Sequence, residues 1–479
     1  MSAITNLQPG EVFYYFEEIS KIPRGSYHTK AISDYCVRFA EQRGLFVVQD
    51  EWNNVIIKKK ASTGFENRRP VIIQGHLDMV CEKTSDSAHN FLTEPLSLYV
   101  EDGFVKAENT TLGADDGIAV AYALALLDSD TIAHPPLEVV FTTDEEVGML
   151  GAEKIDLSLL EGNILLNLDS EEEGILLAGC AGGFDFTMDM PLTRESCEGT
   201  CMKLRIGGLL GGHSGAQIHL QPGNANKLAG RLLAYLDRNT DICLCAVDGG
   251  TKDNVIPSQC DICLVARDKE KVEALCAEML SVWKKEFAAD EPTLFLETTR
   301  NGDGYYSAMS RESMDKVIFF LLNCPSGVYE YSRSLKGLVE TSDNLGVVKT
   351  DECRFHSMIL TRSGILSKLN EFKARLETLA RQLGADFQIN GEYPAWTYRE
   401  ESVIRPIAEA AYQKLTGSKP VVTTIHAGLE CGLFCSKKPE LDCISFGPQM
   451  YDIHSVNERL DIESTQRTWE LLKEILRQC

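Results

Sequence analysis

The strongest constraint on the fold is a series of short, almost wholly apolar strands that alternate with helices. Residues 71–78 (VIIQGHLD), 137–143 (LEVVFTT) and 163–170 (NILLNLDS) predict strands, and 114–129 (ADDGIAVAYALALLDS) predicts a helix between the first two. Strands that lack a polar face are buried on both sides. The pattern therefore predicts an α/β sheet covered by helices on both faces.

This pattern changes near residue 185 and returns near residue 389. The intervening region begins with strands, such as 184–192 (FDFTMDMPL), and then uses a similar order of strands and helices about twice. A chain of 479 residues is also too long for one typical core. We therefore predict an α/β domain made of residues 1–184 and 389–479, interrupted by an inserted α+β domain of two similar halves at 185–388.

Composition excludes several classes of function. The net charge of −24 and the pI near 4.9 argue against binding to nucleic acid or to anionic membranes. The first 21 residues lack the pattern of a signal peptide, and the apolar stretch 118–127 is too short to cross a membrane. Most of the 16 cysteines sit in apolar runs, and Cys260 and Cys263 fall in a predicted strand. We therefore expect reduced cysteines, neither a zinc knuckle nor a redox pair at Cys260 and Cys263, and a cytoplasmic protein.

Polar side chains collect where the predicted strands end. His76 and Asp78 close one strand, and the run VVFTTDEEVG at 139–148 places Glu145 and Glu146 after another. Further examples are Asp115 and Asp116 at a helix start, Asp169 after a strand and His454 far along the chain. Because ligands bind at the carboxyl ends of strands in open α/β sheets, these segments are expected to converge.

Each of these residues also has a simpler interpretation. A single strand-end histidine is usually only hydrogen-bonded, Asp115 and Asp116 could cap a helix, and the acidic run 171–173 is typical of a solvated loop. Taken together, however, two histidines and several carboxylates match the needs of two zinc-like ions that share one carboxylate. An additional carboxylate that is not a ligand can take a proton from the attacking water.

The ordered set of motifs resembles the M20 family of di-zinc peptidases, in particular its aminoacyl-histidine dipeptidase branch. The resemblance covers essentially the whole chain. It rests on the motifs GHLDMV, LGADDGIAVA, TTDEEVGMLGA, LNLDSEEEG, GGHSGAQI, NANK, IHAGLECGLF and HSVNE. It implies a zinc-peptidase catalytic domain with a mixed sheet flanked by helices, interrupted by a lid domain.

The resemblance also implies roles for individual residues. Asp115 would bridge two zinc ions, for which Co²⁺ or Mn²⁺ could substitute, and the peptide bond that follows it would be cis. Asp78 would orient His76, and Glu145 would be the general base. The implied ligands are His76, Asp115 and Asp169 for one ion and Asp115, Glu146 and His454 for the other.

In the inserted domain, the resemblance implies substrate contacts. His213 would stabilise the oxyanion, although a histidine in such a glycine-rich turn is otherwise an ordinary loop residue. Asn254 and Arg362 would hold the substrate carboxylate, and Gly428 would close the pocket floor. Of the other histidines, His426 lies nearest to a motif.

The implied activity is hydrolysis of dipeptides, including Xaa-His dipeptides such as carnosine, by a homodimer formed through the lid. An N-acyl-amino-acid deacylase or an aminopeptidase of the same superfamily is the alternative enzyme. A scaffold protein without activity is disfavoured, because every expected ligand and the base are present.

Overall fold

The computed structural model describes residue 4 and residues 6–479, and the chain divides into two compact units. The first unit runs to Cys180 and also includes Trp396–Thr424 and Leu429–Cys479. The second unit comprises Ala181–Ala395 and Ile425–Gly428. The second unit is therefore longer at both ends than the expected segment 185–388, and it includes a short later segment.

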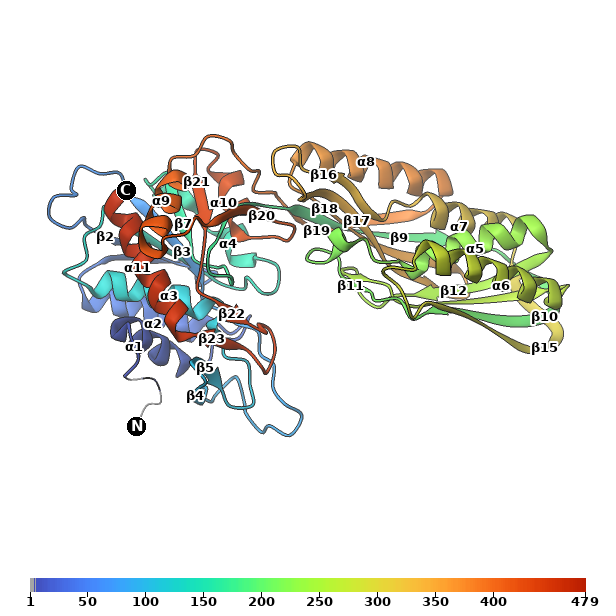
Figure 1. Ribbon diagram of the computed structural model, residues 1–479, viewed down its shortest axis with the longest axis horizontal. Coiled ribbons are helices and arrows are strands. Elements are labelled where there is room, and N and C mark those ends of the chain that lie inside the picture. Colours follow the sequence, from blue (N-terminus) through green and yellow to red (C-terminus); the bar gives the residue numbers. More distant parts are fainter. Residues whose placement is uncertain (1–3, 5) are drawn as a thin grey trace. The chain divides into compact units, whose positions relative to one another are not determined.

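The first unit is built on an eight-stranded mixed sheet (Figure 1). Its strand order is β1 (Phe46–Gln49), β2 (Val55–Lys59), β6 (Leu137–Thr142), β3 (Val71–His76), β7 (Ile164–Asn167), β21 (Asp442–Ser445), β8 (Ile175–Cys180) and β20 (Val421–Ile425). The central strands β6, β3, β7 and β21 are parallel, and every residue of β3 and β6 is buried, as their apolar sequences predict. A smaller sheet contains β22 (Met450–Tyr451), β23 (Arg459–Asp461), β5 (Phe104–Ala107) and β4 (Leu98–Glu101).

Helices cover this sheet. They are α1 (Gly10–Ser20), α2 (Lys30–Gln42), α3 (Ala114–Asp128), α4 (Leu150–Lys154), α9 (Ile404–Thr416), α10 (Glu430–Lys437) and α11 (Ile462–Gln478), with a 3₁₀ turn at η1 (Leu157–Leu159). Helix α3 is buried along almost its whole length because it packs between α1 and β3. Its approach to the sheet requires a glycine at position 75, where a Cβ atom would lie 2.6 Å from that of Ala119.

The second unit contains one nine-stranded antiparallel sheet with helices packed on it. The strands are β15 (Phe295–Met309), β10 (Arg194–Gly207), β14 (Cys260–Ala266), β12 (Ile242–Gly249), β17 (Val339–Thr350), β18 (Arg354–Ser363), β9 (Gly182–Pro191) and β19 (Asp386–Tyr393), and β16 (Gly327–Tyr331) pairs with β17. The helices are α5 (Ala225–Asn239), α6 (Lys269–Glu286), α7 (Arg311–Asn323) and α8 (Leu366–Leu383), and the smaller elements are β11 (Gly212–His213), β13 (Val255–Ile256) and η2 (Ile218–Leu220). The pairing of β12 with β17 joins the two expected halves into one sheet.

The cysteines differ in one respect from the sequence-based expectation. Cys197 and Cys243 form a disulfide with a Cα–Cα distance of 6.6 Å, whereas all cysteines were expected to be reduced. The prediction failed because these residues are 46 positions apart, and only the strand arrangement brings them together. Cys260 and Cys263 lie in strand β14, as expected. Among the described residues, no helix has the length and apolar content needed to span a membrane.

Candidate active site and metal centre

The predicted convergence of polar strand ends occurs in the first unit. Strands β6, β3 and β7 are parallel neighbours, so the residues that follow them leave the sheet at the same edge. The Leu77 N–H donates to the Thr142 carbonyl at 2.8 Å, and the Leu168 N–H donates to the Gln74 carbonyl at 3.0 Å. These two bonds extend the ladder just far enough to place His76, Glu145 and Asp169 at the same edge.

Three groups of potential metal ligands occur among the described residues. Within each group the ligand atoms lie within 4.8 Å of one another, and the groups are His76, Asp116 and Asp169; His76, Glu145 and Glu146; and Asp115, Glu146 and His454. The last group is the set that the resemblance implied for one ion. For the other ion, the resemblance implied Asp115 with His76 and Asp169. The group that contains His76 and Asp169 has Asp116 in place of Asp115.

Asp115 nevertheless lies between the two histidines. Its Oδ1 is 3.2 Å from His76 Nε2, and its Oδ2 is 3.0 Å from His454 Nε2. Asp169 Oδ1 is 3.8 Å from His76 Nε2. The Asp115–Asp116 peptide bond is cis, as the resemblance implied. Unlike Asp115, Asp116 accepts a hydrogen bond from the backbone N–H of His76, through Oδ2 at 3.1 Å. Its Oδ1 is buried without a hydrogen-bond partner.

Asp78 supports two parts of this centre at once. It is fully buried, and its Oδ1 lies 3.4 Å from His76 Nδ1, on the side of the ring opposite to Asp115. The same carboxylate accepts the backbone N–H groups of Glu145 and Glu146 at 3.1 and 3.3 Å. Asp78 thus fixes both the histidine ring and the loop that carries the two glutamates.

The centre gathers more carboxyl groups than its two histidines, His76 and His454, can neutralise. Among the described residues, no lysine or arginine lies within ion-pair distance of Asp115, Glu145, Glu146 or Asp169. Burial raises the pKa of Glu145 to about 8, with repulsion from Glu430, Glu146 and Asp115 adding to the effect. Burial likewise raises the pKa of Asp169 well above its usual value. Metal cations would compensate this charge, and imidazole and carboxylate groups are suitable ligands for zinc.

The expected substrate contacts all belong to the second unit. Strand β11 pairs with β13, so that His213 is opposite Val255, and the Ser214 N–H donates to the Asn254 carbonyl at 2.9 Å. Arg362 is 8% exposed, donates through one terminal nitrogen to the Tyr393 hydroxyl at 2.6 Å, and has a buried Nε without a partner. Gly428 ends the Ile425–Gly428 segment of this unit.

His213 is held in one defined tautomer. Its Nδ1 accepts the backbone N–H groups of Gly215 and Ala216 at 3.2 and 3.0 Å. Burial and the nearby charge of Arg362 lower the pKa of His213, so the neutral ring predominates at neutral pH. In that state the proton is on Nε2, which can donate a hydrogen bond.

Comparison with known proteins assigns this arrangement to a family. The family described as "Peptidase family M20/M25/M40" matches residues 72–478. The chain belongs to this peptidase family. The match confirms the family and the α/β fold class predicted from the sequence. As a member of a peptidase family, the protein is a hydrolase.

Two relatives match this M20 peptidase over its full length. Cytosol non-specific dipeptidase of Escherichia coli (strain K12) is 40% identical over 484 residues, which cover 100% of this chain and 99% of the relative. The crystal structure of aminoacylhistidine dipeptidase from Vibrio alginolyticus is 37% identical with a TM-score of 0.94, covering 100% of this chain and 98% of that chain. Aminopeptidase PepT from Bacillus cereus ATCC 10987 shares the fold, with a TM-score of 0.56 at 16% identity and 98% of each chain covered.

Two buried charged residues that the sequence analysis missed hold the segment before Asp115. Glu458, which is 3% exposed, accepts the N–H groups of Leu112, Gly113 and Ala114 at 2.8, 2.9 and 2.8 Å. Arg24, which is 2% exposed, donates to the carbonyl groups of Leu77, Asp78 and Gly113. This M20 peptidase therefore fixes the backbone of the Asp115 turn from both sides.

We expect Glu458→Gln to lower metal affinity by about 10- to 100-fold, as losses of outer-sphere support commonly do. The NH2 group of the glutamine would face backbone N–H groups that now donate to the carboxylate, so the segment that carries Asp115 would shift. Metal affinity can be measured by competition with a chelator.

Glu291 in the second unit offers a matched control for this change. It is also 3% exposed, and it accepts the N–H groups of Leu210 and Gly223 at 2.7 and 2.8 Å. Glu291→Gln should lower thermal stability and leave metal affinity unchanged. Wild-type metal affinity in Glu458→Gln would contradict a positioning role for Glu458.

Two further residues belong to a predicted motif. The sequence analysis missed Glu430, whereas it singled out His426 as the histidine nearest to a motif. Glu430 is fully buried and accepts hydrogen bonds from Thr142 Oγ1 at 2.7 Å and from the Gln74 side chain. His426 contacts Ser342 Oγ through Nε2 at 2.7 Å, and burial together with Arg362 lowers its pKa to about 3. Only the IHAGLECG motif could have pointed to either residue, since both lie within it.

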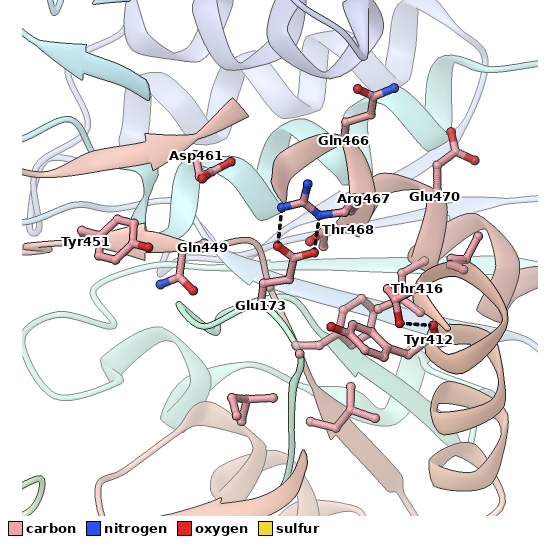
Figure 2. Close-up of a pocket in the computed structure, with 17 residues that line it drawn as sticks. Glu173, Tyr412, Thr416, Gln449, Tyr451, Asp461, Gln466, Arg467, Thr468 and Glu470 are labelled. Carbon is pink, nitrogen blue, oxygen red and sulfur yellow. Dashed lines mark hydrogen bonds and ion pairs between the residues drawn. The ribbon is translucent and has the colours of Figure 1, made fainter. Parts of the chain in front are cut away.

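In the acidic run at 171–173, Glu171 and Glu172 are exposed as expected, whereas Glu173 is half-buried. Glu173 forms a two-pronged ion pair with Arg467, at 2.6 and 2.7 Å, inside a cavity of about 670 Å³ in the first unit (Figure 2). None of the predicted site residues lines this cavity. Asp144, which precedes Glu145, is half-buried and accepts the Tyr27 N–H at 2.6 Å.

Proposed function

We propose that this M20 peptidase hydrolyses dipeptides in a metal-dependent reaction and that Xaa-His dipeptides such as carnosine are among its substrates. The observation that carries the proposal is the edge of the first-unit sheet, where His76, His454 and several carboxyl groups meet beside Glu145. The choice of dipeptides is supported by full-length similarity to a cytosol non-specific dipeptidase and to an aminoacylhistidine dipeptidase.

We propose two zinc ions per chain, which Co²⁺ or Mn²⁺ can replace. His76, Asp115 and Asp169 would hold one ion, and Asp115, Glu146 and His454 would hold the other. The position of Asp115 between the two histidines supports its bridging role. Bound ions would polarise the scissile carbonyl and lower the pKa of a coordinated water.

Glu145 is proposed to carry the proton. Its backbone is fixed by Asp78, and burial raises its pKa to about 8, which suits a group that must both accept and return a proton near neutral pH. Glu145 would remove a proton from the attacking water and then deliver it to the leaving amine. Asp78 would keep the loop and the His76 ring in place during both steps.

Residues of the second unit are proposed to recognise the substrate. Arg362 is buried, has an unpartnered Nε, and forms no ion pair with an acidic residue among those described, so a substrate carboxylate is a suitable partner. The buried Asn254 Oδ1 also lacks a partner. We assign both residues to the end of the dipeptide that carries the free carboxylate, and Gly428 to the pocket floor.

His213 is proposed to stabilise the oxyanion. Its Nε2–H is the free donor of a neutral ring whose Nδ1 is occupied by two backbone N–H groups. This contact would strengthen only as negative charge develops on the carbonyl oxygen.

We also propose a cytoplasmic homodimer formed through the second unit. The cytosolic location named for the Escherichia coli relative supports the first part. The second part is supported by apolar side chains exposed on α7, where Phe319 and Leu322 are 48% and 39% exposed.

The test is a comparison of kcat/KM for dipeptides, amidated dipeptides, tripeptides and N-acyl amino acids. We expect dipeptides with a free carboxylate to be strongly preferred. Arg362→Ala should raise KM and remove the preference for free over amidated substrates. His213→Ala should act mainly on kcat, because it removes a contact made in the transition state.

Other outcomes would assign a different activity. Comparable rates on tripeptides and amides would indicate an aminopeptidase. A preference for N-acyl amino acids would indicate a deacylase. The first result would also contradict the proposed binding of a free substrate carboxylate by Arg362. The second would not, because N-acyl amino acids carry the same carboxylate.

A further inference from the structure

One face of the second-unit sheet carries a row of sulfur atoms that the proposed function does not use. In strands β10, β14 and β12, residues such as Met202, Leu264 and Leu244 face the helices and belong to the main core of this unit. The alternate residues face the other side, and they include Cys201, Cys263 and Cys245. The Cys197–Cys243 disulfide and its apolar neighbours lie on this side as well.

The free thiols Cys201, Cys263 and Cys245 come from the neighbouring strands β10, β14 and β12. Cys201 Sγ lies 3.8 Å from Cys263 Sγ. Cys263 also has Cys245 beside it in the pairing of β12 with β14. A bulge in β12 accounts for this placement, because Leu244 pairs with Leu264 and Ala246 pairs with Cys263, which leaves Cys245 as the extra residue beside Cys263.

Cys245 also lies beside a positive charge held by the backbone. The Arg194 side chain donates to four carbonyl groups, those of Cys245 (3.2 Å), Asp351 (2.8 Å), Glu352 (2.8 Å) and Ser307 (3.3 Å). No carboxylate among the described residues forms an ion pair with Arg194, so its charge is not neutralised locally. A fixed guanidinium next to a cysteine favours the thiolate, which is the reactive form.

The exposure of the thiols suits reaction with a small molecule. Cys245 and Cys263 are half-buried, whereas Cys201 is 7% exposed. The hydrogen bond from Cys263, together with Arg194, lowers the pKa of Cys245 against the opposing effect of burial. The hydrogen bond to Cys245, followed by burial, raises the pKa of Cys263. Because Arg194 lies beside Cys245, Cys245 is the better candidate for the nucleophile of the pair.

We propose that Cys245 and Cys263 form a redox-active dithiol that reduces hydroperoxides and becomes an intramolecular disulfide. The Cys245 thiolate attacks the peroxide, whose O–O bond breaks, giving a sulfenic acid on Cys245 and releasing water (or an alcohol) once the leaving oxygen takes up a proton. The Cys263 sulfur then attacks the Cys245 sulfur, an S–S bond forms, and a second water leaves with the Cys263 proton. Two thiols lose two electrons and the peroxide gains them.

Other thiol pairs in the protein lack one of these features. Cys435 Sγ and Cys443 Sγ are only 3.4 Å apart, but their pKa values are strongly raised, by thiol hydrogen bonds together with burial. Cys81 and Cys353 are exposed, but no contact with a second thiol accompanies either of them in the described part of the chain. The pair in β12 and β14 combines a cation, a neighbouring thiol and partial exposure.

The test uses the full-length, metal-loaded protein treated with stoichiometric hydrogen peroxide at neutral pH. We expect the wild type to lose two of its fourteen free thiols, reversibly by dithiothreitol, and peptide mapping to find Cys245 linked to Cys263. Cys245→Ser should slow this loss about tenfold or more, since the thiolate is absent. Cys263→Ser should stop at a sulfenic acid on Cys245 that dimedone traps.

Cys201→Ser is the matched control, because Cys201 also contacts Cys263 but is not part of the proposed pair. It should behave as the wild type, and unchanged dipeptidase activity and thermal unfolding will show that each variant is folded. A bridge from Cys263 to Cys201, a bridge from Cys245 to Cys353 or Cys243, or equal thiol loss in the wild type and Cys245→Ser would overturn the proposal.

Discussion

Replacing Glu145 by Gln is expected to lower kcat by about 10³-fold, the range typical for loss of a general acid–base group. The amide cannot accept a proton from the attacking water or return one to the leaving amine. The two oxygens of Asp78 would still hold the backbone of this loop, since they contact the main-chain N–H groups of residues 145 and 146. KM and metal content should therefore remain close to those of the wild type.

Glu146→Gln is the matched variant, because it changes the adjacent carboxylate by the same single atom. Glu146 lies 3.0 Å from His454 Nε2 and shares a ligand group with Asp115, so this variant should lose one metal ion. Glu145 also belongs to one potential ligand group, with His76 and Glu146, and the comparison therefore decides between the two roles. Equal metal loss in both variants, or an active Glu145→Gln enzyme, would refute the proposed division.

The sequence is a good guide to the core of the first unit. Its central strands are parallel and buried on both faces, so their apolar sequences predict both the strands and the sheet edge where His76, Glu145 and Asp169 meet. His454 is different, because it follows no buried central strand, and its assignment to one metal ion came from the motif resemblance. Local pattern therefore predicts the scaffold, and motif order predicts the residue that comes from far along the chain.

The features that the sequence did not reveal depend on the path of the backbone. Glu458 and Arg24 act on main-chain N–H and carbonyl groups, which have no side-chain signature in the partner segment. The Cys197–Cys243 disulfide and the contact between Cys245 and Cys263 depend on strand register and on a bulge, neither of which follows from alternation of apolar residues. Such contacts require the assembled sheet.

The adjacent residues Asp115 and Asp116 should respond in opposite ways to the same substitution. Asp115 contacts both histidines, and although burial opposes its ionisation, hydrogen bonds with His454 and His76 lower its pKa below the usual value. Asp115→Asn would remove the charged group proposed to bridge two cations. We expect it to lose most bound metal and nearly all activity.

Asp116 is ionised much less readily than its neighbour. Burial, with repulsion from Asp169, raises the pKa of Asp116 well above its usual value, so a protonated side chain is favoured at neutral pH. A neutral Asp116 resembles asparagine in shape, and the His76 N–H that it accepts at 3.1 Å can be accepted equally well by an amide oxygen. Asp116→Asn should therefore keep two metal ions per chain and most of the wild-type activity.

Metal analysis and dipeptide hydrolysis on both variants provide the measurement. If Asp116→Asn lost an ion while Asp115→Asn kept both, Asp116 would be the ligand beside His76 and Asp169, and the bridging role of Asp115 would have to be abandoned.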